Sequence, residues 1–203
     1  MGIGNLRLSK AVFLDRDGVI NPPVGLDEFG GTESPLRFED FRIFPWTAEA
    51  VKILNDLGFY VFVVTNQPAI AKNKTDIIEL RKMHCLLDYE VKMKGGEIKK
   101  IYVCLHHPDP KQVVFTDLLV DCDCRKPKPG MLFQAAREFN IDLARSWMIG
   151  DTWKDVQAGQ AAGCRTILIR NEIDNAGKIL NPDFTAENLL EAAKIIEREE
   201  TES

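Results

Sequence analysis

The sequence predicts an α/β fold in which helices cover both faces of a mostly parallel β-sheet. Short apolar runs alternate with helix-like segments along most of the 203 residues. Runs of mostly apolar residues are typical of strands that are buried on both faces, as in parallel sheets. Gly58 and Gly163 end two helix-like segments directly before apolar runs, where a left-handed helix stop is favoured. One domain with one core suits a chain of this length.

The expected strands and helices follow from this alternation. The run AVFL predicts the first strand, the segment that ends at Gly58 predicts the first helix, and Pro129 favours a helix start just after it. The charged end, residues 197–203, is expected to fray. The expected strands are 11–14, 60–65, 98–105, 146–151 and 165–170, and the expected helices are 47–58, 74–96, 130–140, 154–163 and 186–200.

Two long segments interrupt the alternation. Residues 21–46 contain too many Gly and Pro residues for a regular element, and we expect a flap over the end of the first strand. Residues 104–130 form the second segment. Both contain apolar and aromatic residues, which argues against disorder and favours a functional role.

Composition excludes several classes of protein. A net charge of −5 gives no general basic field, so a nucleic-acid partner is not expected. No apolar run approaches the roughly 20 residues of a membrane span, and the first ten residues lack the apolar core of a secretion signal. We expect a soluble, cytoplasmic monomer with a small-molecule partner. An odd number of cysteines, five, argues against a disulfide framework and leaves thiols for a metal.

Two carboxylates follow the first strand. Asp15 and Asp17 lie one residue apart, before Gly18. At the carboxyl end of a parallel strand they could hold Mg²⁺, attack as a nucleophile or transfer a proton. An Asp-Gly turn is the structural alternative. An EF-hand is excluded, since it would need glycine at Ile20 and glutamate at Leu26.

Other polar residues are expected at the same sheet edge. Thr65 and Asn66 end the second strand, and Asp151 ends the fourth, with Asp155 four residues later. The segment RKPKPG adds Arg125, Lys126 and Lys128 before a helix. Each of these features has a structural explanation as a cap or a solvated loop, but their joint occurrence at strand and loop ends indicates a phosphate site.

These motifs resemble those of the haloacid dehalogenase superfamily of phosphotransferases. The four motifs read FLDRDG, VVTN, RKPKPG and IGDTWKD, in the order that the superfamily has. The resemblance implies a Rossmann-like three-layer sandwich without a large cap domain. It also implies catalysis through a phosphorylated aspartate.

Residue roles follow from the same resemblance. Asp15 would be the nucleophile, and Asp17 would protonate the leaving oxygen and then activate water. Asp15, Asp151 and the backbone carbonyl of Asp17 would bind Mg²⁺, with Asp155 behind them. Thr65, Asn66 and Lys126 would hold the phosphoryl oxygens, with Lys128 as the alternative to Lys126. Arg16 is expected to point away from the site.

A cysteine cluster lies within the second long segment. Cys104, His106, Cys122 and Cys124 offer three thiolates and one imidazole, which together make a closed, structural zinc site over residues 104–124. His107 could replace His106. The alternative is scattered buried thiols, which is how Cys85 and Cys164 are interpreted.

Together with FLDRDG, this zinc loop is similar to a subgroup that contains heptose 1,7-bisphosphate phosphatases and histidinol-phosphatases. The long gap between His106 and Cys122 resembles the heptose enzymes, and Arg125 would then bind the sugar or its second phosphate. Pro68, Ala69 and Lys72 depart from the usual pattern. Histidinol phosphate is the nearest alternative substrate. A phospho-receiver switch, which would not need Asp17, and a zinc-organised binding module are alternatives of other classes.

Overall fold

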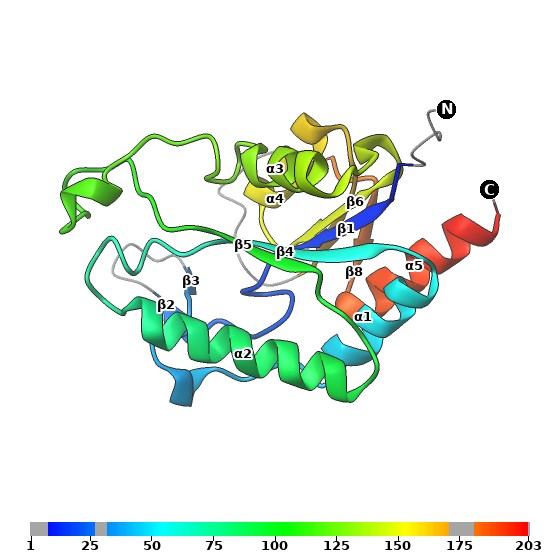
Figure 1. Ribbon diagram of the computed structural model, residues 1–203, viewed down its shortest axis with the longest axis horizontal. Helices are drawn as coiled ribbons and strands as arrows, with labels where there is room; N and C mark the ends of the chain where they lie inside the picture. Colours follow the sequence, from blue (N-terminus) through cyan, green and yellow to red (C-terminus); the bar gives the residue numbers. More distant parts are fainter. Residues whose placement is uncertain (1–7, 27–31, 171–180, 203) are drawn as a thin grey trace, which may run out of the picture.

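The computed structural model of the protein describes residues 8–26, 32–170 and 181–202. Within these ranges the chain forms a six-stranded, wholly parallel sheet with the order β5-β4-β1-β6-β7-β8. Figure 1 shows the strands running side by side through the middle of the molecule. In chain order they are β1 (Ala11–Leu14), β4 (Tyr60–Asn66), β5 (Lys100–Cys104), β6 (Trp147–Gly150), β7 (Arg165–Ile169) and β8 (Phe184–Ala186).

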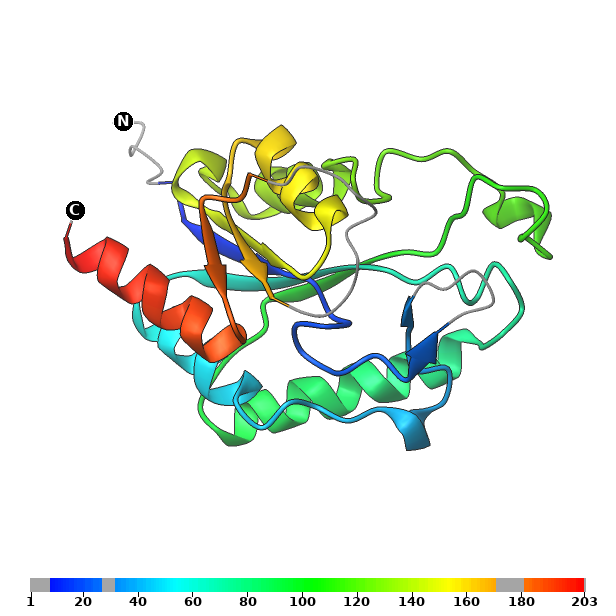
Figure 2. The same ribbon diagram turned by 180° about the vertical axis from the view of Figure 1, so that it is seen from behind.

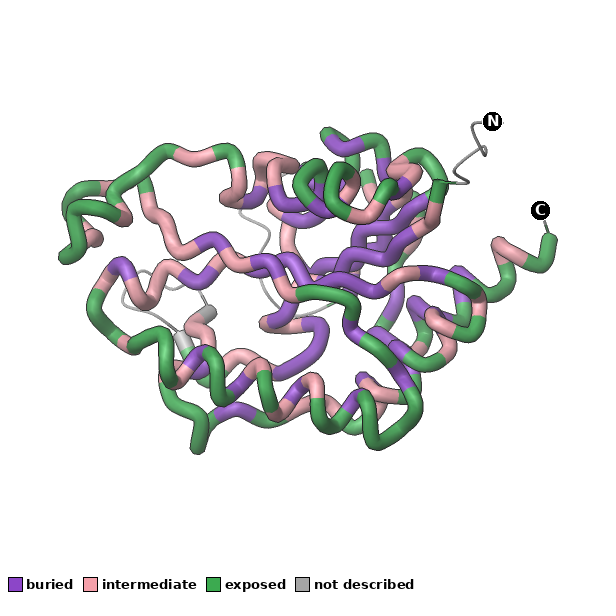
Figure 3. The backbone as a smooth tube through the Cα atoms, in the orientation of Figure 1, coloured by how far each residue is buried: buried purple, intermediate pink, exposed green. Residues whose placement is uncertain are grey.

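Helices cover both faces of the sheet, which confirms the three-layer fold. One face carries α1 (Thr47–Asp56), α2 (Ile77–Met93) and α5 (Leu189–Thr201), and the other carries α3 (Gly130–Phe139) and α4 (Trp153–Ala162) (Figures 1 and 2). The side chains of β1 alternate between the two layers: Val12 and Leu14 belong to one buried cluster, and Ala11 and Phe13 to the other. The tube in Figure 3 is accordingly buried along the central strands.

The order of the strands fixes where a ligand can bind. From β1 the chain adds β4 and β5 on one side, and then it crosses to the other side for β6, β7 and β8. Strand order therefore reverses between β1 and β6, and ligands of open parallel sheets bind at such a point, beyond the carboxyl ends of the strands. The ladder continues to this edge, since the Asp15 N–H donates to the Ile149 carbonyl at 2.9 Å.

Two expectations about the elements near the end of the chain need correction. Strand β8 was not expected, because its three residues lie in a polar stretch. The expected fraying of residues 197–203 is wrong as far as Thr201, because α5 extends to that residue and Glu199 and Glu200 form ion pairs with Arg165 and Lys10.

Residues 21–46 also contain more structure than a plain loop. Strand β2 (Gly25–Leu26) pairs antiparallel with β3 (Thr32–Glu33), and a short 3-10 helix, η1 (Phe38–Asp40), follows. Part of this flap, residues 27–31, lies outside the described ranges. Among the described residues, no helix is long and apolar enough to cross a membrane.

Candidate active site

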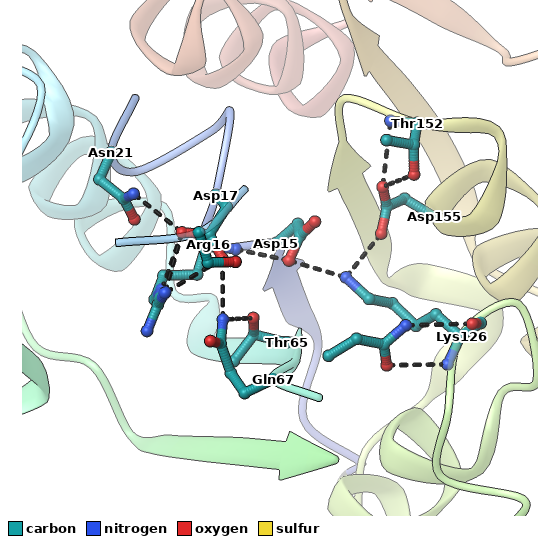
Figure 4. A network of polar contacts seen from close by, with 11 residues as sticks. Asp15, Arg16, Asp17, Asn21, Thr65, Gln67, Lys126, Thr152 and Asp155 are labelled. Carbon is teal, nitrogen blue, oxygen red and sulfur yellow. Dashed lines mark hydrogen bonds and ion pairs between the residues drawn. The ribbon is translucent and has the colours of Figure 1, made fainter. Parts of the chain in front are cut away.

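Polar side chains from the ends of β1, β4 and β6 and from the RKPKPG segment meet at the edge where strand order reverses. Figure 4 shows Asp15 between two groups of partners, with Asp17 and Arg16 on one side and Lys126 and Asp155 on the other. The structure therefore brings together side chains that lie more than a hundred residues apart in the sequence.

Lys126 is the centre of the second group. Its Nζ lies 2.8 Å from Asp15 Oδ1 and 2.6 Å from Asp155 Oδ1, and its side chain is buried. Burial opposes the charge of this ammonium group, but Asp15 and Asp155 raise its pKa above the usual value, so it remains a cation. Lys128, the alternative, is only partly buried and pairs with Asp121.

Asn66 contacts the backbone of this lysine. Its Nδ2 donates to the Lys126 carbonyl, and its Oδ1 accepts from the Lys126 N–H, both at 3.1 Å. In this structure the Asn66 side chain therefore fixes the loop that carries Lys126 next to the end of β4. The expected contact between Asn66 and a phosphoryl oxygen stays a prediction.

Asp155 is fixed just as firmly. The backbone N–H and hydroxyl of Thr152 donate to Asp155 Oδ2 at 3.1 and 2.7 Å. The backbone contact is one half of a capping box at the start of α4, in which the Thr152 side chain accepts from the Asp155 N–H. Gly150 allows this close approach, because a Cβ atom there would lie 2.0 Å from the Cβ of Asp155. The other oxygen of Asp155 is thereby directed at Lys126.

Three carboxylates gather beside the Lys126 ammonium group. One oxygen each from Asp15, Asp151 and Asp155 lie within 4.8 Å of one another. Burial, together with the neighbouring Asp155 and Asp17, raises the pKa of Asp15 to about 7, although Lys126 lowers it. Burial and the Asp15 carboxylate raise the pKa of Asp151 too. Oxygen ligands with this excess of negative charge fit a divalent cation such as Mg²⁺.

The side chain of Asp17 lies outside this group of three carboxylates. Both of its oxygens accept hydrogen bonds: Arg16 donates to it through Nη2 at 2.9 and 3.1 Å, and Asn21, Ser34 and Gln67 each donate at 2.8 to 2.9 Å. Burial would raise the pKa of Asp17, but the Arg16 guanidinium and the hydrogen bonds from Asn21 and Ser34 hold it below its usual value.

The expectation that Arg16 points elsewhere is therefore wrong. Its side chain is fully buried and holds the neighbouring carboxylate. Sequence analysis also missed Asn21, Ser34 and Gln67. A polar residue between buried apolar neighbours was the available signal for Asn21, but spacing gives no indication for Ser34, because the flap has no periodic pattern.

Two other residues predicted to bind the phosphate lie beside this centre. Thr65 is buried, and its Oγ1 accepts from Gln67 Nε2 at 2.9 Å. Arg125 donates to the His106 carbonyl at 3.2 Å, so it connects the active-site segment to the cysteine cluster. Their contacts with a substrate stay predictions.

The cysteine cluster assembles as a compact group. Ligand atoms of Cys104, His106, Cys122 and Cys124 lie within 4.8 Å of one another, with Cys124 Sγ 3.1 Å from Cys122 Sγ and 3.5 Å from His106 Nδ1. His107 is not part of the group. Three sulfur atoms and one ring nitrogen at this separation fit the tetrahedral ligand set of structural zinc. Figure 1 shows that the connecting residues extend as an arm beyond the sheet.

Comparisons with known proteins agree with this geometry. Residues 123–192 match the family described as HAD-hydrolase-like. The D-glycero-beta-D-manno-heptose-1,7-bisphosphate 7-phosphatase of Yersinia pestis is 36% identical over 161 residues, which are 79% of this chain and 80% of the relative. The chain belongs to this phosphatase family.

Further members support the assignment. The family's representative from Pasteurella multocida (strain Pm70) is 33% identical over 93% of this chain and 97% of its own. The crystal structure of D,D-heptose 1,7-bisphosphate phosphatase from B. bronchiseptica, complexed with magnesium and phosphate, superposes with a TM-score of 0.76 at 28% identity. It covers 94% of this chain and 99% of its own. The expected relationship to the superfamily and to its heptose subgroup is confirmed.

Proposed function

We propose that this chain is a Mg²⁺-dependent phosphomonoesterase that removes the 7-phosphate of D-glycero-β-D-manno-heptose 1,7-bisphosphate. The observation that carries the proposal is the contact of Lys126 with both Asp15 and Asp155, beside Asp151, at the point where strand order reverses. The names of the relatives support the substrate. We further propose that one domain performs the reaction. The cytoplasmic location and the monomeric state stay predictions.

The reaction takes place in two displacements. An oxygen of Asp15 attacks phosphorus while the bond from phosphorus to the sugar oxygen breaks. Asp17, whose pKa the bound phosphate dianion raises so that it takes up a proton with the substrate, gives this proton to that sugar oxygen. Water then attacks the phosphorus of the phosphorylated Asp15, Asp17 takes a proton from this water, and Asp15 leaves. Inorganic phosphate is released, and both aspartates return to their starting states.

Charge neutralisation is the main demand of this chemistry. A phosphate dianion repels the Asp15 carboxylate, and preorganised positive groups usually supply the largest share of the rate. Lys126 supplies one such group from within the chain. Asp15, Asp151 and the backbone carbonyl of Asp17 would hold Mg²⁺, which when bound neutralises phosphoryl oxygens. Thr65 and Asn66 lie at the same edge to orient the phosphate.

We propose that the cysteine cluster binds structural zinc. Zinc at Cys104, His106, Cys122 and Cys124 would order the segment that leads directly to Arg125 and Lys126. In this proposal Arg125 binds the sugar or its second phosphate.

Phosphate release from a substrate panel tests the function. The panel contains both anomers of heptose 1,7-bisphosphate, histidinol phosphate and fructose 1,6-bisphosphate, each assayed with Mg²⁺. We expect the highest kcat/KM for the β anomer, and Asp15→Asn should abolish turnover without unfolding the protein. A preference for histidinol phosphate would overturn the substrate assignment. Near-normal turnover by Asp15→Asn would overturn the mechanism, and inactivity towards every substrate would favour a binding module.

A further inference from the structure

Arg16 has no part in the reaction described above, yet its side chain is fully buried beside the reacting groups. Its Nε and Nη2 donate to Asp17, with the shortest contact at 2.9 Å. Its other terminal nitrogen, Nη1, lies 3.5 Å from Nε2 of His84 on α2. The guanidinium carbon also lies 5.6 Å from the centre of the Phe41 ring. The Arg16 guanidinium therefore binds Asp17 on one side and contacts His84 and Phe41 on the others.

A contribution to folding alone explains this arrangement poorly. Arg16 and Asp17 are adjacent in the sequence, so their ion pair connects no distant parts of the chain. The desolvation of a buried pair also offsets most of its electrostatic gain. What the planar guanidinium does provide is a fixed orientation for the carboxylate, because two parallel N–H groups define its plane.

His84 extends this control to a helix on one face of the sheet. Burial and the nearby Arg16 lower the pKa of His84 to about 4, so the ring is neutral near pH 7 and its Nε2 can accept from Arg16. A second positive charge beside Arg16 is thereby avoided. His84 consequently holds Arg16 without competing with Asp17 for it.

We propose that Arg16 is a positioning residue, held by His84 and Phe41, that orients the Asp17 carboxyl group for proton transfer to the leaving oxygen. This inference rests on the proposed function. The proton moves from Asp17 to the oxygen whose bond to phosphorus breaks, while the new bond from Asp15 to phosphorus forms. Such a transfer requires hydrogen-bond reach, and a displacement of about 1 Å can cost about 100-fold in rate.

Leaving-group dependence separates this role from a purely structural one. A sugar oxygen needs a proton to leave, whereas the oxygen of 2,4-dinitrophenyl phosphate leaves without one. For Arg16→Met we expect the rate of the first displacement, measured as the pre-steady-state burst of released alcohol, to fall about 100-fold with heptose bisphosphate, the scale of general-acid catalysis, and to change less than about threefold with the dinitrophenyl ester. Arg42→Met removes an exposed arginine of the neighbouring segment and should change both rates less than about twofold.

Two further variants keep the test decisive. Asp17→Asn should show the same selective loss in the burst rate of the first displacement, and should slow hydrolysis of phosphorylated Asp15 with both esters. If its burst rate falls equally with both esters or with neither, the proposed function and this inference fail together. His84→Leu retains Arg16 but removes the ring that Arg16 contacts, and we expect a selective loss of about 10-fold in the rate with heptose bisphosphate. If Arg16→Met does not fold, the result for His84→Leu tests the proposal in its place. Where Asp17→Asn is selective, an equal loss on both esters, or no loss, in the Arg16 or His84 variant overturns the positioning role alone.

Discussion

At the scale of single residues, two glycines with the same backbone conformation have different surroundings. Gly18 and Gly58 have φ values of +85° and +83°, in the left-handed region that favours glycine. A Cβ atom at Gly18 would lie 1.9 Å from Asp151 Oδ2, whereas one at Gly58 would meet nothing within 4 Å. The first glycine therefore gives Asp151 its position, and the second only ends a helix.

Alanine at these positions should separate the two effects. Both variants should lose about 1 kcal/mol of unfolding free energy from the strained backbone. Gly18→Ala should in addition bind Mg²⁺ at least about tenfold more weakly, because Asp151 must move. Calorimetric Mg²⁺ titration of both variants provides the measurement. Equal Mg²⁺ affinity in the two would show that Asp151 is not held by this contact.

The protonation of His84 should appear in the stability of the protein. Its folded pKa of about 4 lies below the usual 6.5, so between these values the unfolded chain binds more protons than the folded one. Stability contributed by neutral His84 is present above pH 6.5 and is lost as the pH falls towards 4, by roughly 3 kcal/mol. Urea unfolding from pH 7 to 4.5 checks this prediction, with His84→Gln as the reference. If the protein and the variant lose stability in parallel, His84 does not titrate in this way.

At the scale of elements, the arm that carries the cysteine cluster leads directly into the active site. Cys124 precedes Arg125 and Lys126, and the Asn66 side chain holds the Lys126 backbone from the sheet side. Lys126 is thus fixed from two directions, by a strand end and by the cluster.

Removal of one ligand should loosen only the arm. We expect Cys124→Ser to lose bound zinc, to exchange amide hydrogens faster over residues 104–124, and to lose activity as Lys126 becomes less ordered. Cys85→Ser, at an exposed position on α2, should keep its zinc and its activity. Elemental analysis and hydrogen exchange measure both outcomes. Zinc retained by Cys124→Ser would show that the ligand set is wrong.

The elements differ in how clearly the sequence predicts them. Long periodic segments and buried apolar runs were predicted well, because burial on one or both faces leaves a regular pattern. The three residues of β8 are too few for such a pattern, and their strand character comes from pairing with β7. Residues 197–201 were misjudged since their helix is held by partners on other elements, among them Arg165.

The sequence likewise predicts some parts of the candidate site and not others. Motif spacing placed Asp15, Asp151 and Lys126 at one edge, because parallel strands end together. Spacing could not show that Asn66 would turn to the Lys126 backbone, or that Arg16 would fold back onto Asp17. Such contacts depend on side-chain rotamers and on loops whose paths the sequence pattern does not determine.

At the scale of the whole molecule, the sheet is assembled from distant parts of the chain. Val12 of β1 pairs with Val61 on one side and with Trp147 on the other. The two halves of the sheet therefore meet at β1, and the reacting groups come together only when both are present. Contacts over such separations are typical of slowly folding topologies.

This arrangement has a consequence for synthesis on the ribosome. The Ala11 N–H donates to the Ser146 hydroxyl, 135 residues later, and at about 5–20 residues per second the ribosome needs about 7 to 27 s to make that partner. During this interval one edge of β1 has no strand to pair with. An arrested nascent chain that ends before Trp147 should therefore be cut rapidly by protease, and one that extends past β7 should resist. Equal protease resistance of the two arrested chains would show that β1, β4 and β5 fold before β6, β7 and β8 have been synthesised.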